Sequence, residues 1–182
     1  ETAFDREVLA QFLGENEPLT PVITPFTRRT FSLADTARIR QGAYAMVVNA
    51  YEAEIICKKT EISLEDLKRK IELLIVTQGK NGSHIYQNGE LIEVPAFSAK
   101  EIKDPTGAGD AFRGGLLRGM AAGFPIKLCA LMGSLCASYV LEHVGTQNHY
   151  FTVPEFIERF RGEHVVLEEG EKPPVGDDAR QQ

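Results

Sequence analysis

Residues 104–110 read Asp-Pro-Thr-Gly-Ala-Gly-Asp, and they join a strand-like region to a long segment with helical periodicity. We call these residues the anion turn. Small residues at 107–109 allow backbone N–H groups to come close to a ligand. The helix that follows adds roughly half a positive charge at its N-terminus. Together these features predict a turn that binds an anion and leads from a sheet into a helix.

Asp110 lies where the anion would be bound. A carboxylate beside an anion is electrostatically unfavourable unless it must accept a proton from an attacking hydroxyl. A general base for phosphoryl transfer therefore explains both the glycines and the acid. The alternative is a purely structural role, in which Gly107 and Gly109 only turn the chain and Asp110 caps the helix. Local sequence leaves both interpretations open.

The chain before the anion turn predicts an α/β fold. Residues 44–48 and 73–77 are continuous apolar runs typical of strands buried on both faces, and residues 51–57 and 63–70 between them are expected to be helical. Strand, helix, strand at this spacing implies a parallel crossover. Asn88-Gly89, between strand-like residues 83–87 and 91–94, is typical of a β-hairpin, which adds an antiparallel pair.

The other elements are predicted from periodicity and from the positions of Pro and Gly. A short strand is expected at residues 22–23, and helices are expected at residues 4–12, 33–40, 110–123, 125–143 and 154–161. Glycines at 114, 115, 119 and 123 would each cost up to about 1 kcal/mol relative to Ala. Close approach of another helix or of a ligand is the expected compensation. Residues 1–167 are expected to form one partial domain, and the acidic residues 168–182 a flexible tail.

Composition narrows the class of protein. The chain has 182 residues, of which 43% are apolar and 25% charged, as in globular proteins. Acidic residues outnumber basic ones by 26 to 20, so no nucleic-acid-binding face is expected. No apolar stretch of about 18 residues predicts a membrane span. Three cysteines without a CxxC pair favour a reducing, cytoplasmic location over a disulfide framework or a zinc site.

A second candidate segment is residues 77–82, Thr-Gln-Gly-Lys-Asn-Gly. It follows a predicted buried strand at the carboxyl end, where open α/β sheets bind their ligands. Thr77 offers a hydroxyl group, and Gly79 and Gly82 allow close backbone approach. The alternative is an ordinary turn that leads into the hairpin.

A third candidate segment follows the other buried strand. Asn49 and Glu52 are three residues apart, so they project to the same side of the opening helix turn. An amide oxygen and a carboxylate at that place could orient hydrated Mg²⁺. The alternative is that Asn49 simply caps the helix.

In this order and spacing, the three segments resemble the ribokinase-like (PfkB) carbohydrate and nucleoside kinases. The resemblance covers roughly residues 20–162. It implies a three-layer α/β/α fold with a mostly parallel central sheet and a hairpin at one side. The N-terminal part and the small β lid of such kinases are expected to be absent from this sequence. The matching motifs are Asn49-x-x-Glu52, Thr77-x-Gly79-x-x-Gly82 and Asp104-x-Thr106-Gly107-Ala108-Gly109-Asp110-Ala111-Phe112.

The resemblance implies an ATP-dependent phosphotransferase that moves the γ-phosphoryl group to a primary hydroxyl. Asp110 would be the general base, and the amides of Gly107, Ala108 and Gly109 would form an anion hole. Magnesium, held through water, would be organised by Glu52 and Asn49. The implied nucleotide contacts are Thr77, Gly79, Gly82, Ser134 and Gly145.

Acceptor identity depends on the resemblance alone. Residues 110–115 and 139–147 look most like the bacterial adenosine-kinase-like branch, so a nucleoside is expected, with Asp110 and Arg113 at its site. Asp104 matches the position that helps to hold a monovalent cation such as K⁺ in some members. A kinase for ribose, fructose or a similar sugar is one alternative, and a non-catalytic nucleotide-binding module is another. The partners expected are the nucleoside or sugar, ATP and a second copy of the chain, but neither nucleic acid nor a membrane.

Overall fold

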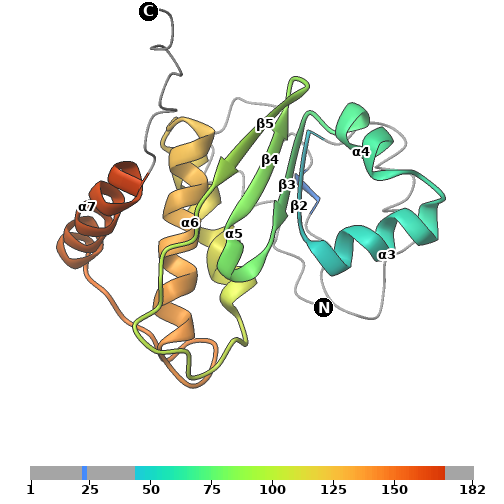
Figure 1. Cartoon of the computed structure of the whole chain (residues 1–182). Helices are drawn as coiled ribbons and strands as arrows, with labels where there is room; N and C mark the ends of the chain where they lie inside the picture. Colours follow the sequence, from blue (N-terminus) through green and yellow to red (C-terminus); the bar gives the residue numbers. More distant parts are fainter. Residues whose placement is uncertain (1–21, 24–43, 171–182) are drawn as a thin grey trace, which may run out of the picture. The chain divides into compact units, whose positions relative to one another are not determined.

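The structure is a computed structural model that describes residues 22–23 and 44–170 (Figure 1). Contacts along the chain divide it into two compact units, Glu1–His149 and Tyr150–Gln182. The helices predicted at residues 4–12 and 33–40 lie outside the described residues. None of the described helices combines the length and the apolarity that a membrane span requires.

Within the described residues, the first unit contains a five-stranded mixed sheet in the order β1-β2-β3-β4-β5. The first three strands are parallel, and the last two add antiparallel pairs. The predicted parallel crossover followed by a hairpin is therefore confirmed, with two parallel and two antiparallel pairings in the described part. The strands are β1 (Val22–Ile23), β2 (Ala45–Asn49), β3 (Leu73–Thr77), β4 (Ser83–Gln87) and β5 (Glu90–Val94).

Helices cover both faces of this sheet. α3 (Ala50–Thr60) and α4 (Leu64–Lys70) lie on one side, and α5 (Ala108–Ala121) and α6 (Ile126–Leu141) lie on the other (Figure 1). The three-layer α/β/α arrangement expected from the sequence is thus confirmed. Ser63 is the N-cap of α4, as predicted, and its side-chain oxygen accepts the backbone N–H of Asp66 at 3.0 Å.

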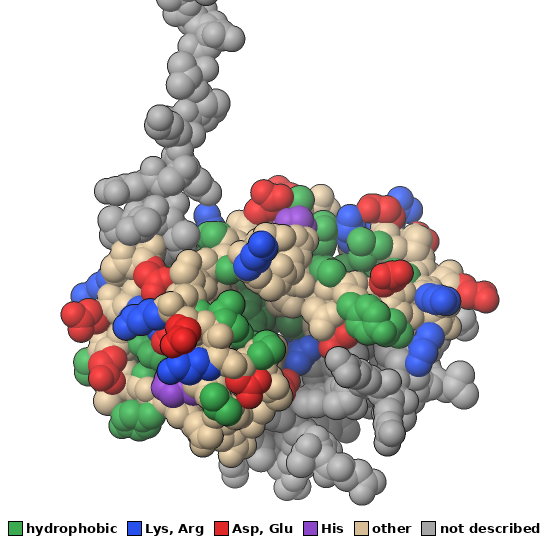
Figure 2. Space-filling model, turned by 60° about the horizontal axis from the view of Figure 1, so that its bottom comes forward, with side chains coloured by type: hydrophobic (Ala, Val, Ile, Leu, Met, Phe, Trp, Pro, Cys, Tyr) green, Lys and Arg blue, Asp and Glu red, His purple; other side chains and the backbone are tan. Residues whose placement is uncertain are grey.

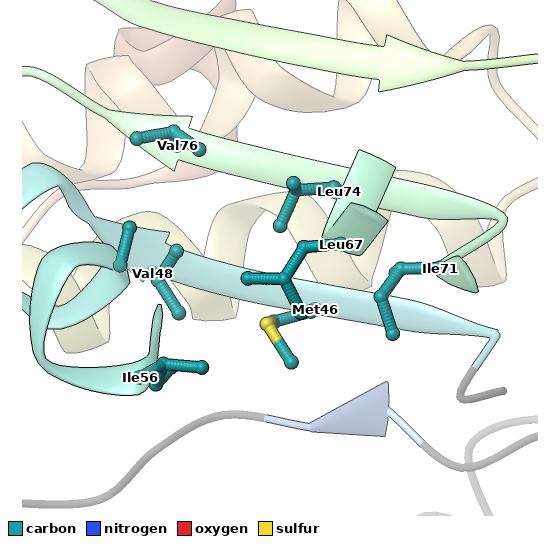
Figure 3. Packing of buried hydrophobic residues seen from close by; sticks show 8 residues of the cluster. Met46, Val48, Ile56, Leu67, Ile71, Leu74 and Val76 are labelled. Carbon is teal, nitrogen blue, oxygen red and sulfur yellow. The ribbon is translucent and has the colours of Figure 1, made fainter. Parts of the chain in front are cut away.

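The core explains why β2 and β3 are apolar throughout. Alternate residues of the two strands, with Met46 and Leu74 among them, pack against Ile56 of α3 and Leu67 of α4 (Figure 3). The intervening residues are buried as well, since successive side chains of a strand point to opposite faces. Ala45, Val47, Leu73 and Ile75 are each no more than 2% exposed. Both faces of these strands therefore contribute to the core.

α5 and α6 pack with their backbones unusually close. A Cβ built at Gly115 would lie 2.8 Å from the Gly133 Cα, the Met132 carbonyl oxygen and the Cys136 Sγ. A Cβ built at Gly119 would lie 3.0 Å from the Cys129 Cα. Tight helix packing, one of the two compensations expected for the helical glycines, therefore accounts for these positions.

Neighbouring glycines on α5 give a matched test of this packing. We expect Gly115→Ala to lower the free energy of unfolding by about 1–3 kcal/mol, because the added methyl group overfills the helix interface. Gly114→Ala should raise it by up to about 1 kcal/mol, because Ala is the better helix former and no atom lies within 4 Å of its Cβ position. Urea unfolding of the full chain measures both changes. Equal effects at the two positions would contradict the interpretation.

Several helix boundaries differ from those predicted, most by one to three residues. α5 begins at Ala108, before the predicted residue 110, and Pro125 precedes α6 as its N-cap. α7 (Val153–Gly170) is much longer than the predicted 154–161, and it includes residues 168–170, which were expected to belong to a tail. The sequence has no Pro or Gly at residues 163–169, so nothing there ends the helix.

Candidate active site

Parallel pairing brings the second and third candidate segments side by side. Asn49 and Thr77 are the last residues of β2 and β3, and they are register partners. The Thr77 hydroxyl donates to the Val48 carbonyl oxygen at 3.4 Å. Both segments thus leave the carboxyl edge of the sheet, which is the usual ligand-binding edge of open α/β sheets.

Asn49 and Glu52 form a capping box at the start of α3. The Asn49 Oδ1 accepts the Glu52 N–H at 2.8 Å, and the Glu52 Oε2 accepts the Asn49 N–H at 2.9 Å. The capping alternative weighed for Asn49 is therefore what the structure shows. The same bonds fix both side chains at the sheet edge, so a role in organising an ion or phosphate remains compatible with them.

Residues 78–82 form a tight turn into the hairpin, as the structural alternative predicted. Gly79–Asn81 is a short 3₁₀ helix, and the Gln78 N–H donates to the Gly82 carbonyl oxygen at 2.8 Å. Gly82 has φ +85°, and a Cβ there would lie 2.0 Å from the Val94 carbonyl oxygen. Gly79 has φ +58°, with no atom within 4 Å of its Cβ position. Of these two glycines, only Gly79 thus leaves open space where a ligand could approach.

The anion turn leads directly into α5. Gly107 is the N-cap, at φ +87° and without a side-chain capping bond, and Asp110 is the third residue of the helix. The alternative in which Asp110 caps the helix is therefore not observed. The first N–H groups of a helix have no carbonyl partner within it, and they carry its positive end. The Asp110 side chain, which belongs to the first turn of α5, is 65% exposed.

Asp104 fastens the anion turn to the loop that follows α6. Its two carboxylate oxygens each accept a backbone N–H at 2.9 Å, one from Thr106 and one from Gly145. Hydrogen bonds from the Thr106 side chain, then from the two backbone N–H groups, lower the pKa of Asp104. The Lys103 N–H donates to the Leu141 carbonyl oxygen at 2.8 Å and adds a further link to α6.

The lowered pKa of Asp104 predicts a pH-dependent contribution to stability. The folded state favours the charged carboxylate, so this contribution is present above the ordinary aspartate pKa, near 4, and is lost as pH falls through the lower folded value. We expect Asp104→Asn to lower the urea midpoint at neutral pH, with a difference from wild type that shrinks below about pH 4. A difference that is constant with pH would contradict this.

Arg113 connects the start of α5 to the start of α3. Its Nη1 lies 3.0 Å from the Asp110 Oδ1, and its Nη2 lies 3.4 Å from the Glu52 Oε2. The shorter pair could have been found from the sequence, because residues three apart are neighbours on a helix. The longer pair joins residues 61 positions apart, and sequence reasoning missed it.

Ser134 lies in a different environment from the other predicted site residues. It is buried in α6, and its hydroxyl oxygen accepts the Phe97 N–H at 2.7 Å. This bond joins α6 to the segment after β5. Gly145, which was also predicted as a nucleotide contact, lies beside the anion turn through its bond to Asp104.

The carboxyl edge thus gathers most of the predicted site residues. Strand register places Asn49 of the capping box beside Thr77. Arg113 then contacts both Glu52 of the capping box and Asp110 of the anion turn. Figure 2, which brings the bottom of Figure 1 forward, shows acidic and basic side chains spread among apolar ones over this face. The arrangement combines helix-end N–H groups, an exposed carboxylate and an arginine. Such a set can bind an anion and accept a proton beside it.

A profile of the pfkB family of carbohydrate kinases matches residues 10–152. The chain belongs to this family. It is 33% identical over 120 residues to the nucleoside kinase of Methanocaldococcus jannaschii, an alignment that covers 66% of this chain and 40% of that protein.

Solved structures agree with the family. The nucleoside kinase of Burkholderia thailandensis in complex with inosine superposes with a TM-score of 0.70 at 35% identity, over 74% of this chain and 45% of that one. The ribokinase of Thermotoga maritima shares the fold, with a TM-score of 0.66 at 19% identity over 77% of this chain and 48% of that one. The chain therefore has the ribokinase-like fold, and it spans less than half the length of each of these relatives.

Proposed function

We propose that the chain is the nucleotide-binding and catalytic part of an ATP- and Mg²⁺-dependent nucleoside kinase. The observation that carries the proposal is the position of Asp110. Its exposed carboxylate lies in the first turn of α5, at the edge where β2 and β3 end. A purely binding site gains nothing from a negative charge beside a phosphate, whereas an in-line transfer needs a proton acceptor at that place.

In this proposal Asp110 takes the proton from a primary hydroxyl as the oxygen attacks the γ-phosphorus of ATP. The bond from that phosphorus to the bridging oxygen breaks, and ADP leaves. Negative charge on the transferring group is met by the N–H groups of Gly107, Ala108 and Gly109, which form the proposed anion hole. Gly107 is suited to its place because φ +87° is a left-handed conformation that favours glycine.

The oxygen donors of Asn49 and Glu52 suit magnesium, and the Asn49 Oδ1 and Glu52 Oε2 already accept backbone N–H groups, so the ion would be held through water. A carboxylate and an amide oxygen are hard ligands, and Mg²⁺ usually keeps several waters and binds through one or two carboxylates together with substrate phosphates. The described residues contain no cluster of three or more His, Cys, Asp or Glu side chains that could hold a metal alone. When bound, the ion neutralises charge on the phosphates.

The nucleotide contacts are proposed in the same way. Thr77 and Gly79 lie at the sheet edge, and Gly145 is tied to the anion turn. Gly82 and Ser134 have structural roles instead. Gly82 allows the close approach of the Val94 carbonyl group, and Ser134 accepts the Phe97 N–H. A K⁺ ion beside Asp104 stays a prediction, and both oxygens of that carboxylate already accept N–H groups.

A nucleoside is favoured over a sugar as the acceptor. Two similar proteins carry the name nucleoside kinase, and one of them was solved with inosine. A sugar kinase would use the same base and anion hole, so the geometry of these residues does not separate the two. We also propose a cytoplasmic location, since all three cysteines are unpaired. The homodimer stays a prediction.

The test is ADP release by the full chain with Mg·ATP and separate acceptors. Adenosine, inosine and cytidine would be compared with ribose and fructose, and ADP binding would be measured by calorimetry in parallel. Faster turnover with a nucleoside supports the proposal. Turnover with sugars alone selects the sugar kinase, and nucleotide binding without turnover on any acceptor selects the non-catalytic module.

A further inference from the structure

We propose that Arg113 is a positioning residue for the general base, not a contact to the acceptor. In this view Glu52 holds the Arg113 guanidinium, and the guanidinium holds the Asp110 carboxylate in the orientation needed for proton transfer. The inference rests on the proposed function and assigns a role to a side chain that the three family motifs leave unexplained.

Burial differs sharply along this chain of charges. The Asp110 side chain is 65% exposed, whereas Arg113 is 15% exposed and Glu52 26%. An exposed aspartate is free to change rotamer unless a partner holds it. Arg113 is held more firmly than Asp110, because it is mostly buried and both of its terminal nitrogens contact a carboxylate.

The contacts use the particular shape of arginine. Nη1 faces Asp110 and Nη2 faces Glu52, so one planar group spans α5 and α3. The Nε atom is shut away from solvent, without a hydrogen-bond partner among the described residues. Lysine carries one point charge on a flexible stem and cannot reproduce a rigid two-ended contact. Both terminal nitrogens of Arg113, Nη1 and Nη2, already face carboxylates, and this argues against a contact between Arg113 and the acceptor.

Charge balance gives a second reason for arginine here. Glu52 and Asp110 are two negative charges beside a turn that is proposed to receive a polyphosphate, and Arg113 brings the sum of the three side chains, before any metal ion binds, to −1. Nη1 also lies 3.7 Å from the Cβ position of Gly109, so the guanidinium packs directly against the anion turn. Its positive charge thus reduces the repulsion between the base and the phosphates.

The experiment compares Arg113→Met, Arg113→Lys and the control Arg118→Met in the full chain. Arg118 lies on the same helix and is exposed. We expect Arg113→Met to lower kcat by about 10–100-fold, the scale of losses from misplaced catalytic groups, with an unchanged KM for the acceptor. Arg113→Lys should recover only part of kcat, and Arg118→Met should behave as wild type.

A double variant separates positioning from other roles. In an Asp110→Asn background, Arg113→Met should lower the residual turnover no further, because its effect passes through Asp110. An equal further loss in that background would overturn the proposal, and so would a raised acceptor KM with an unchanged kcat. These outcomes are distinct from failure of the proposed function, in which the wild-type chain itself transfers phosphate to no acceptor.

Discussion

Asp110→Asn is expected to lower kcat by about 10³-fold or more, which is within the range that general-base catalysis contributes. The amide is nearly the same size as the carboxylate, so the first turn of α5 should keep its shape. Its N–H groups would still bind phosphate, and the affinity for ADP should change little. Steady-state kinetics and calorimetry on the full chain measure the two quantities separately.

Asp66→Asn is the matched control. Asp66 is a carboxylate on α4, whose C-terminal end leads to the start of β3, opposite the carboxyl edge of the sheet. That variant should retain wild-type kcat. Near-normal turnover in Asp110→Asn would remove the proposed mechanism, because the proton would then have another acceptor. A parallel loss of ADP affinity would instead assign Asp110 a role in shaping the anion turn.

Gly82→Ala should produce the largest loss of stability among the changes considered. Its Cβ would lie 2.0 Å from the Val94 carbonyl oxygen and 2.9 Å from the Pro95 carbonyl carbon, both backbone atoms that cannot rotate away. Overpacking typically costs about 1–3 kcal/mol, and the backbone conformation of Gly82, φ +85° and ψ −136°, adds about 1–3 kcal/mol for a residue with a Cβ. A total of about 3 kcal/mol or more is a large part of a typical folding free energy.

Gly79→Ala is the control for the backbone term. It also has a positive φ, +58°, but its Cβ would meet no atom within 4 Å. We expect a loss of only about 1–2 kcal/mol. Urea unfolding of the full chain gives both values. Similar losses of unfolding free energy in the two variants would show that the close contact with Val94 is not the reason for glycine at position 82.

Local patterns were sufficient to predict much of the fold. The apolar runs of β2 and β3 and the Asn88-Gly89 turn express local preferences, and each forms an element close to its predicted bounds. The predicted end of α7, at residue 161, was wrong, and residues 168–170 belong to the helix although their acidic composition was taken to mark a tail. Charge alone does not end a helix, and Pro173 lies several residues further on.

The site was only partly predictable, because several of its contacts join residues far apart in sequence. The sheet edge that gathers Asn49 and Thr77 follows from parallel strands, and this was foreseen. The bond from Gly145 to Asp104 joins residues 41 positions apart. It depends on how α6 returns along the sheet, and no spacing rule indicates it. The same holds for the contact between Arg113 and Glu52.

The attachment of the anion turn to α6 bears on how such an enzyme could change shape. Asp104 and Lys103 bond to the loop after α6 and to its last turn, while Gly115 and Gly119 hold α5 tightly against the same helix. α5, its leading turn and α6 therefore form a rigid corner. Closure around a substrate should leave this corner unmoved, and other parts of the protein should travel towards it.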